Sequence, residues 1–317
     1  METFFILLEI LSPLLWAIGL GLAVGLTLRA LILHIQRPRE ARGNPRPCLS
    51  PTLQWMNTAG AILLAANRGQ FRLMAGCIYP GLEWRHVNST QKMLLEWWDI
   101  RDHSSALHEM NDVLHIGTHA RYRAEMEELS ARYGNASEME LIEIAKQTNP
   151  KADEDSFLPR MLLAYRRYGE NALLGWDVGR VCYIMQCCYV AGYVSMEEVL
   201  DLGVEAGRKA QAFFHNWEEM MESYLLGGQY WKREDAGDRN SMTAKRFRLY
   251  ERLWKGKRPY KSIPFSTVPF DTPLSKEVLT DQYGILPEFQ KEFESAVQWG
   301  YRQRDKQKQS PRGGTVE

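Results

Sequence analysis

An apolar segment near the start of the chain constrains its architecture more than any other feature. Residues 4–28 contain one ionisable side chain, Glu9, and from Leu14 onward they form an apolar run with interspersed glycines. About 20 apolar residues suffice to cross the hydrocarbon core of a bilayer. The pattern therefore predicts a single transmembrane helix from Phe4 to Leu28, anchored in membrane lipid.

Two other interpretations of this segment are open. A cleaved signal peptide would need a basic segment before the apolar run and a small-x-small cleavage site after it, and the chain has neither. A buried helix of a soluble core would be disfavoured by three glycines, Gly19, Gly21 and Gly25. We therefore expect an uncleaved anchor.

The charges on either side of the apolar segment predict its orientation. Only Glu2 precedes it, whereas five arginines follow within a short distance: Arg29, Arg37, Arg39, Arg42 and Arg46. Short flanks rich in arginine stay on the cytoplasmic side of a membrane. We expect the N-terminus outside and the remaining chain in the cytoplasm.

Helical periodicity predicts an all-α class for the remaining chain. No alternating run of useful strand length is present, and apolar residues recur at helical spacing. The expected helices cover residues 52–67, 90–98, 104–132 with a break near Gly117, 157–168, 176–191, 195–226 ending at Gly227-Gly228, and 287–303. Ser137 with Glu140, and Ser195 with Glu198, have the spacing of capping boxes.

These patterns divide the chain into five segments. The predicted anchor covers residues 1–35 and a linker rich in proline and arginine covers residues 36–51. A compact multi-helix domain follows at 52–232. An irregular, basic and proline-rich extension with a terminal helix covers 233–303, and a disordered tail covers 304–317.

Charge and cysteine content exclude two broad classes of protein. The 39 Lys and Arg residues balance 39 Asp and Glu residues, whereas dedicated nucleic-acid-binding proteins carry a strongly basic face, so we expect no nucleic acid partner. Five irregularly spaced cysteines do not form the pattern of a disulfide framework. We interpret them as reduced, buried thiols.

A row of histidines is a low-ranking candidate metal site. His108, Asp112, His115 and His119 would share one face of an unbroken helix, and imidazole and carboxylate groups can ligate divalent metals. A helix break near Gly117 would separate His119 from the others. The alternative is a solvated polar face. We predict neither a metal nor any other cofactor.

A charged pair within an apolar segment is the main catalytic candidate. Asp177 and Arg180 are spaced i,i+3, close enough to pair on a helix. One interpretation is a buried pair that fixes how helices dock, because unpaired buried charge is costly. The other is a pocket in which Asp177 acts as acid or base, Arg180 holds an anion, and His119 contributes.

Aromatic residues and a basic block suggest binding surfaces. Trp217, Tyr224 and Trp231 recur at roughly helical spacing, which indicates either a core stripe or a partner-binding groove. Residues 232–261 hold eleven basic and four acidic residues, which indicates either a solvated helix or contact with anionic lipid. The common catalytic motifs, such as a P-loop or a nucleophile elbow, are absent.

An ordered series of short motifs runs through residues 49–232. They are Leu49-Ser50-Pro51, Trp98-Asp99-Ile100, Gly117-Thr118-His119, Gly175-Trp176-Asp177-Val178-Gly179-Arg180, Gly192-Tyr193-Val194-Ser195, Trp217-Glu218-Glu219 and Ser223-Tyr224-Leu225-Leu226-Gly227. In this order they resemble the domain family DUF1266. The family pattern commonly has glycine before the histidine, where this chain has Thr118.

The resemblance implies a bacterial source, hence the inner membrane, and a compact domain ending near Trp231. It transfers no mechanism, but it directs attention to Trp98, Trp176 and Trp217. Our leading hypothesis is a membrane-tethered cytoplasmic protein-interaction domain, either a scaffold or an immunity or stress accessory. The alternative is an enzyme, such as a hydrolase, with Asp177, Arg180 and His119 in its pocket. The expected binding residues are Trp98, Trp176, Trp217, Tyr224 and Trp231.

Overall fold

The computed structural model describes residues 16–28, 48–147, 157–234, 238–256 and 264–309, except the side chains of His119, Lys146 and Gln147. The chain divides into two units, Met1–Pro45 and Arg46–Glu317. Residues 36–47 of the predicted linker and residues 310–317 of the predicted tail lie outside the described residues. Each unit is considered by itself below.

The N-terminal unit corrects the prediction of a membrane anchor. Its described part is a helix over residues 16–28. No helix among the described residues combines the length and apolar character needed to cross a membrane. The predicted span from Phe4 to Leu28 is therefore wrong, and so is the single-pass inner-membrane location. Residues 4–15 of that span lie outside the described part.

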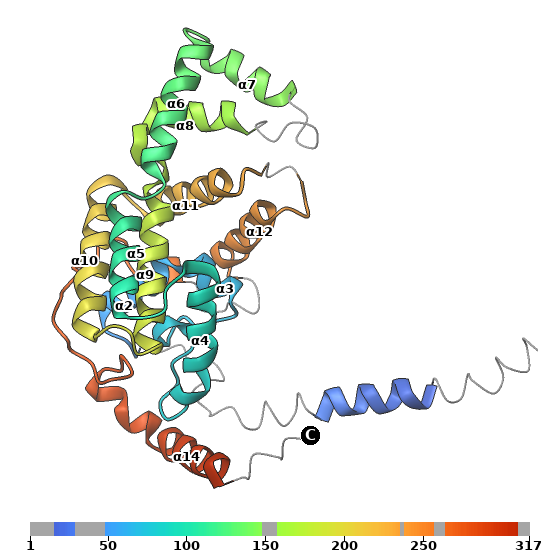
Figure 1. Ribbon diagram of the computed structural model, residues 1–317, viewed down its shortest axis with the longest axis vertical. Coiled ribbons are helices and arrows are strands. Elements are labelled where there is room, and N and C mark those ends of the chain that lie inside the picture. Colours follow the sequence, from blue (N-terminus) through green and yellow to red (C-terminus); the bar gives the residue numbers. More distant parts are fainter. Residues whose placement is uncertain (1–15, 29–47, 148–156, 235–237, 257–263, 310–317) are drawn as a thin grey trace, which may run out of the picture. The chain divides into compact units, whose positions relative to one another are not determined.

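The second unit confirms the all-α class. Across its described residues the one extended pairing is an isolated bridge between Leu49 and Ile285. The α-helices are α2 (Pro51–Ala59), α3 (Ala61–Ala66), α4 (Glu83–Trp98), α5 (His103–His115), α6 (His119–Tyr133), α7 (Glu138–Gln147), α8 (Leu158–Tyr168), α9 (Leu174–Val190), α10 (Met196–Phe213), α11 (Trp217–Lys232), α12 (Met242–Trp254), α13 (Pro264–Thr267) and α14 (Gln290–Gln309), and the short 3₁₀ turns are η2 (Met74–Gly76), η3 (Gly169–Leu173) and η4 (Pro287–Phe289) (Figure 1).

Helix α9 is the centre of this unit. It is apolar on all sides and nearly every residue is buried, which is the pattern of a helix surrounded by others. It contacts α2, α3, α4, α5, α10 and α11. Two glycines allow the closest approach, because a Cβ on Gly175 would lie 2.3 Å from the Met220 carbonyl oxygen and one on Gly179 would lie 2.8 Å from the Tyr224 ring.

Local signals predict several helix boundaries correctly and two wrongly. Ser195 and Glu198 form the expected capping box, and Gly117 adopts φ +55° between α5 and α6. The expected continuous helix over 195–226 is wrong, because the backbone is extended at Phe214 and Asn216 caps a new helix. The expected stop at Gly227-Gly228 is also wrong. Both glycines lie inside α11, where a Cβ on Gly227 would lie 2.3 Å from the Cβ of Trp176.

A separate hydrophobic cluster joins α6, α7 and α8 to η3. Its members are Tyr122, Met126, Leu129, Leu141, Phe157, Leu158, Met161, Leu162, Ala172, Leu173 and Tyr230. Glu125 ties α6 to the end of α11, because its carboxylate accepts hydrogen bonds from Tyr230 Oη and from both terminal nitrogens of Arg233 at 2.7–2.8 Å. This cluster is therefore connected to the α9 core through α11.

Candidate functional site

Asp177 and Arg180 form a buried ion pair on α9. The Asp177 side chain has no exposed surface and that of Arg180 is 12% exposed. Arg180 Nη2 donates to Asp177 Oδ1, and Thr118 donates its hydroxyl at 3.0 Å and its backbone N–H at 3.3 Å to the same carboxylate. Arg180 Nη2 also donates to Thr118 Oγ1 at 3.1 Å. The pair therefore fixes the α5–α6 turn against α9.

Two arginines stack on Trp176, the neighbour of this ion pair. The guanidinium carbon of Arg180 lies 4.8 Å from the Trp176 ring centroid, and that of Arg246 from α12 lies 4.9 Å away. Arg180 also lies 5.7 Å from the ring of Trp98. Distances of this size fit cation–π attraction. The ring of Trp231 lies 5.9 Å from that of Trp176, which adds a further aromatic face.

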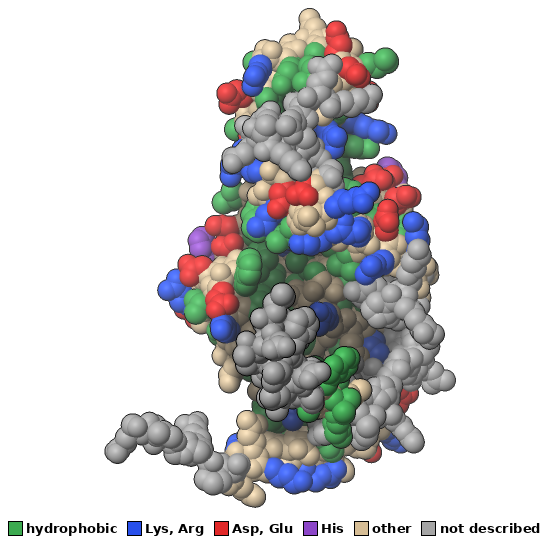
Figure 2. Space-filling model, turned by 90° about the vertical axis from the view of Figure 1, so that its right-hand side faces the viewer, with side chains coloured by type: hydrophobic (Ala, Val, Ile, Leu, Met, Phe, Trp, Pro, Cys, Tyr) green, Lys and Arg blue, Asp and Glu red, His purple; other side chains and the backbone are tan. Residues whose placement is uncertain are grey.

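These residues form part of the wall of a large cavity, which we call the basic–aromatic cavity. Its volume is about 900 Å³, and its wall comes from α3, α4, α5, α9, α11 and α12. The lining residues are Leu63, Ala65, Ala66, Asn67, Arg68, Met93, Trp97, Trp98, Glu109, Trp176, Arg180, Tyr183, Ile184, Trp231, Met242, Lys245, Arg246, Arg248, Leu249 and Arg252. Figure 2 shows basic side chains beside hydrophobic ones around a hollow on this face of the molecule.

The wall of the basic–aromatic cavity is strongly cationic. Six lining residues are Arg or Lys, and Glu109 is the single acid among them. Within the described part of the chain, Arg180 is the one of these six that has an ion-pair partner. Such a concentration of like charge attracts an anion, because low-dielectric walls strengthen the field.

Unsatisfied polar atoms lie behind this wall. Trp176 Nε1, Arg180 Nε and Arg246 Nη1 are buried and have no hydrogen-bond partner among the described residues. Burial raises the pKa of Tyr224, which stacks on Trp176 at 5.1 Å, to about 12 against the opposing effect of Arg246 and Arg180. Buried hydrogen-bond donors without an acceptor are uncommon in folded proteins, so these atoms require an explanation. A ligand in the cavity that carries hydrogen-bond acceptors would reduce this excess of donors.

The aromatic residues predicted to bind are divided between cavity and core. Trp98, Trp176 and Trp231 line the basic–aromatic cavity. Trp217 lies in the core, where its Nε1 donates to the Val268 carbonyl at 2.7 Å, and Tyr224 is fully buried. The cationic wall provided by α12 was missed as a site. Its signal is present in the spacing of Lys245, Arg248 and Arg252, but the sequence pattern of this block predicted either a solvated helix or contact with anionic lipid.

The histidine row does not converge. His108 lies 3.6 Å from Asp112 on an exposed face, whereas His115 lies between Glu205 and Lys209 of α10. His119 begins α6, and its side chain is outside the described residues. No group of three or more potential metal-ligating side chains occurs in the described part of the chain. Among the described side chains, His108, Asp112 and His115 therefore gather no metal site.

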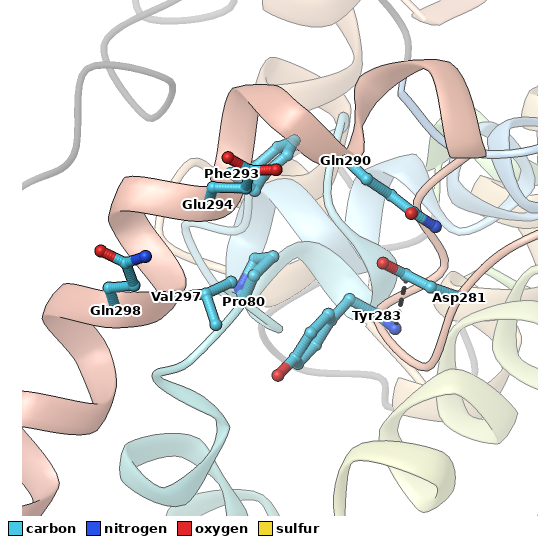
Figure 3. A pocket seen from close by; sticks show the side chains of 8 residues that line it. All are labelled: Pro80, Asp281, Tyr283, Gln290, Phe293, Glu294, Val297 and Gln298. Atoms are coloured by element: carbon cyan, nitrogen blue, oxygen red, sulfur yellow. Dashed lines mark hydrogen bonds between the residues drawn. The ribbon is translucent and has the colours of Figure 1, made fainter.

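A smaller cavity of about 250 Å³ lies between α14 and the segment before α4 (Figure 3). Part of its polar lining is engaged in the fold, because Asp281 Oδ1 accepts the backbone N–H groups of Tyr283 and Ile285 at 2.8 and 3.0 Å. Pockets for small ligands usually measure about 300–1,000 Å³. This cavity falls below that range, so the basic–aromatic cavity is the stronger candidate.

Comparison with known proteins agrees with the motif series. The chain matches the family described as "Protein of unknown function (DUF1266)" over residues 93–265. This range begins and ends later than the resemblance over 49–232, and it includes α12. No curated protein and no solved structure matches the chain significantly. The matched range covers more than half of the sequence, and the chain therefore belongs to the DUF1266 family.

Proposed function

We propose that this chain is a protein-interaction domain and that it holds its partner in the basic–aromatic cavity. The observation that carries this proposal is the composition of the wall, which includes four tryptophans, five arginines and two methionines. Tryptophan, arginine and methionine are enriched at protein interfaces, and the first two dominate their binding energy. The proposal extends the predicted role of Trp98, Trp176 and Trp231.

The burial and the hydrogen bonds of Asp177 favour a binding function over a catalytic one. Its carboxylate has no exposed surface and accepts hydrogen bonds from Arg180 and from two groups of Thr118. A general acid or base must reach the proton that it transfers. Asp177 is separated from the cavity by Arg180, so it supports the wall and does not face a substrate.

The position of the basic residues around the cavity also affects the hypothesis that residues 232–261 contact anionic lipid. Lys245, Arg246, Arg248 and Arg252 belong to this block, and all four line the cavity. A lipid surface is flat on this scale, whereas these side chains surround a hollow. Their placement therefore favours a ligand that enters the cavity, and contact with lipid stays a prediction.

The test compares two tryptophan variants in a pull-down. Trp231→Ala removes a half-exposed ring from the cavity wall, whereas Trp254→Ala removes a similarly exposed ring, 41% against 47%, outside it. We expect the wild type and Trp254→Ala to recover a stoichiometric protein partner and Trp231→Ala to lose it. Equal recovery by all three proteins, or no partner at all, would refute the proposal.

A further inference from the structure

We infer that the partner enters the basic–aromatic cavity as an acidic peptide segment with carboxylate side chains beside a large apolar one. This inference rests on the proposed function and names the chemistry of the bound segment. It is based on the charge of the wall, the order of that charge along α12, the helix ends at the wall and the exposed tryptophans.

The positive charge of the cavity wall complements the negative charge of an acidic segment. Arg68, Lys245, Arg246, Arg248 and Arg252 line the cavity, and none has an ion-pair partner within the described ranges. Arginine binds carboxylates through paired N–H groups, and such bonds are stronger than those between neutral groups. Several carboxylates are needed to match this wall.

The cationic side chains of α12 are ordered along a line. Lys245, Arg248 and Arg252 are spaced at three and four residues, so they share one face of the helix. They extend over about 10 Å at 1.5 Å per residue. An extended peptide covers that distance with about three residues at about 3.3 Å each. Every second residue of an extended peptide points to the same side, so acidic residues at alternate positions fit the length of this wall.

One helix end at the wall favours a peptide over a phosphate compound. Helix α4 presents Trp97 and Trp98 of its last turn to the cavity. The last turns of α3 and α11 also reach the wall, but their carbonyl groups already accept the backbone N–H groups of Arg68, Gly69, Arg233 and Glu234. The last carbonyl groups of a helix lack intrahelical donors and carry partial negative charge. Such groups accept N–H donors, which a peptide backbone supplies and a phosphate group does not.

The start of α12 in this wall is already capped. Met242 begins α12, but the backbone N–H of Thr243 donates to Glu234 Oε2 at 3.0 Å and that of Ala244 donates to Ser241 Oγ at 3.0 Å. Phosphate sites at helix starts depend on free backbone N–H groups. The positive charge here therefore comes from side chains, which suit carboxylates.

Exposed tryptophans provide the apolar contact. Trp97 and Trp231 line the cavity and are 68% and 47% exposed. Large apolar surface left open in this way marks an interaction site. We place a Leu, Phe or Trp side chain of the segment against these rings, and its carboxylates on Arg246 and the α12 row.

The experiment measures fluorescence anisotropy of a labelled peptide in which glutamates alternate with leucines around one tryptophan, titrated with the full chain. A peptide of the same order with lysine in place of glutamate is the charge control. ATP and vesicles of anionic phospholipid are separate arms. We expect the acidic peptide alone to bind, more weakly as salt is raised because the attraction is screened.

Two cavity variants and one matched control assign the site. Arg246→Gln and Arg252→Gln each remove one cation from the wall, and each should weaken binding about tenfold, the loss expected for one charge-assisted hydrogen bond. Arg246→Lys keeps the charge but not the forked donor geometry, so its affinity should be intermediate. Arg239→Gln, exposed and outside the wall, should bind like the wild type. Thermal unfolding checks that each variant folds.

The outcomes separate this inference from the proposed function. If ATP or the vesicles bind through Arg246 and the acidic peptide does not, the inference is wrong. If no probe binds but Trp231→Ala still abolishes recovery of a protein partner, the inference is wrong and the proposed function stands. If no probe binds and the pull-down recovers no partner, both fail.

Discussion

At the scale of single residues, Thr118 and Asp177 show how a charge is kept inside an apolar core. Asp177 has no exposed surface, and the hydroxyl of Thr118 both donates to its carboxylate and accepts from Arg180. A glycine at this position, as in the family pattern, would have no hydroxyl for this bridge. The ion pair is a structural part of the cavity wall.

We predict that Asp177→Asn destabilises the protein by about 3 kcal/mol, because breaking a buried pair leaves the other charge uncompensated. The matched control is Asp99→Asn, which breaks an exposed pair with Arg101 at a left-handed position that asparagine tolerates, and which should cost less than about 1 kcal/mol. Urea unfolding measures both. Equal stability of Asp177→Asn and the wild type would contradict the structural role.

A second residue-scale prediction concerns Gly227. Its Cβ would lie 2.3 Å from that of Trp176, so Gly227→Ala must push α11 away from α9. We expect a net loss of about 1–3 kcal/mol from overpacking, although alanine favours a helix by about 1 kcal/mol. Urea unfolding measures the loss. A stabilised variant would show that α11 does not pack this closely.

At the scale of elements, helices are held together by contacts that depend on one or two side chains. Helix α14 meets the segment before α4 through two glycines, because a Cβ on Gly300 would lie 2.1 Å from the Gly81 carbonyl oxygen. Helix α6 is joined to the end of α11 through the carboxylate of Glu125. Each of these contacts can be tested separately.

We predict that Gly300→Ala loosens α14 without unfolding the rest of the unit. Phe293 and Ala296 are buried on the same helix face and would lose their packing. Amide exchange along α14 should accelerate in this variant, and exchange along α9 should not. The exposed position Glu294 provides the control, since Glu294→Ala should leave both unchanged.

The pKa of Glu125 predicts a dependence of stability on pH. Although burial opposes it, hydrogen bonds from Arg233 and Tyr230 lower the pKa of Glu125. A lowered folded-state pKa stabilises the protein above the unfolded pKa of about 4.3, and this contribution is lost as pH falls through the folded value. Glu125→Gln should lose part of this acid dependence in thermal unfolding. Parallel pH profiles for both proteins would argue against the link.

At the scale of the whole molecule, the chain consists of two compact units, Met1–Pro45 and Arg46–Glu317. The buried residues of the α9 core and the cluster of α6, α7 and α8 all lie within Arg46–Glu317. Each cluster is built from helices that bury one or more faces against their neighbours, which is how all-α domains form a core.

We therefore predict that a chain beginning at Arg46 folds and keeps the unfolding midpoint of the second unit. The described residues of the first unit, 16–28, are all exposed, so none of them belongs to this core. Thermal unfolding followed by circular dichroism compares the two proteins. A large drop in the midpoint of the shortened chain would show that the first unit contributes to the stability of the second.

The sequence by itself determined the helical class, most helix starts and the family. These depend on local features, such as the spacing of apolar residues, the side chains of Ser137 and Ser195 that cap α7 and α10, and the motifs from Trp98 to Trp217. The same local reasoning was wrong for the segment from Phe4 to Leu28, since no helix among the described residues is long and apolar enough to cross a membrane.

Only the tertiary structure decided where the site lies. Arg246 and Trp176 are far apart in the sequence and meet because α12 packs on α11 and α3 beside α9. Gly227 resembles a helix stop but lies within α11, since Trp176 occupies the space that a side chain would need. Distant side chains that share one volume leave no local pattern, so the basic–aromatic cavity could not be predicted from spacing alone.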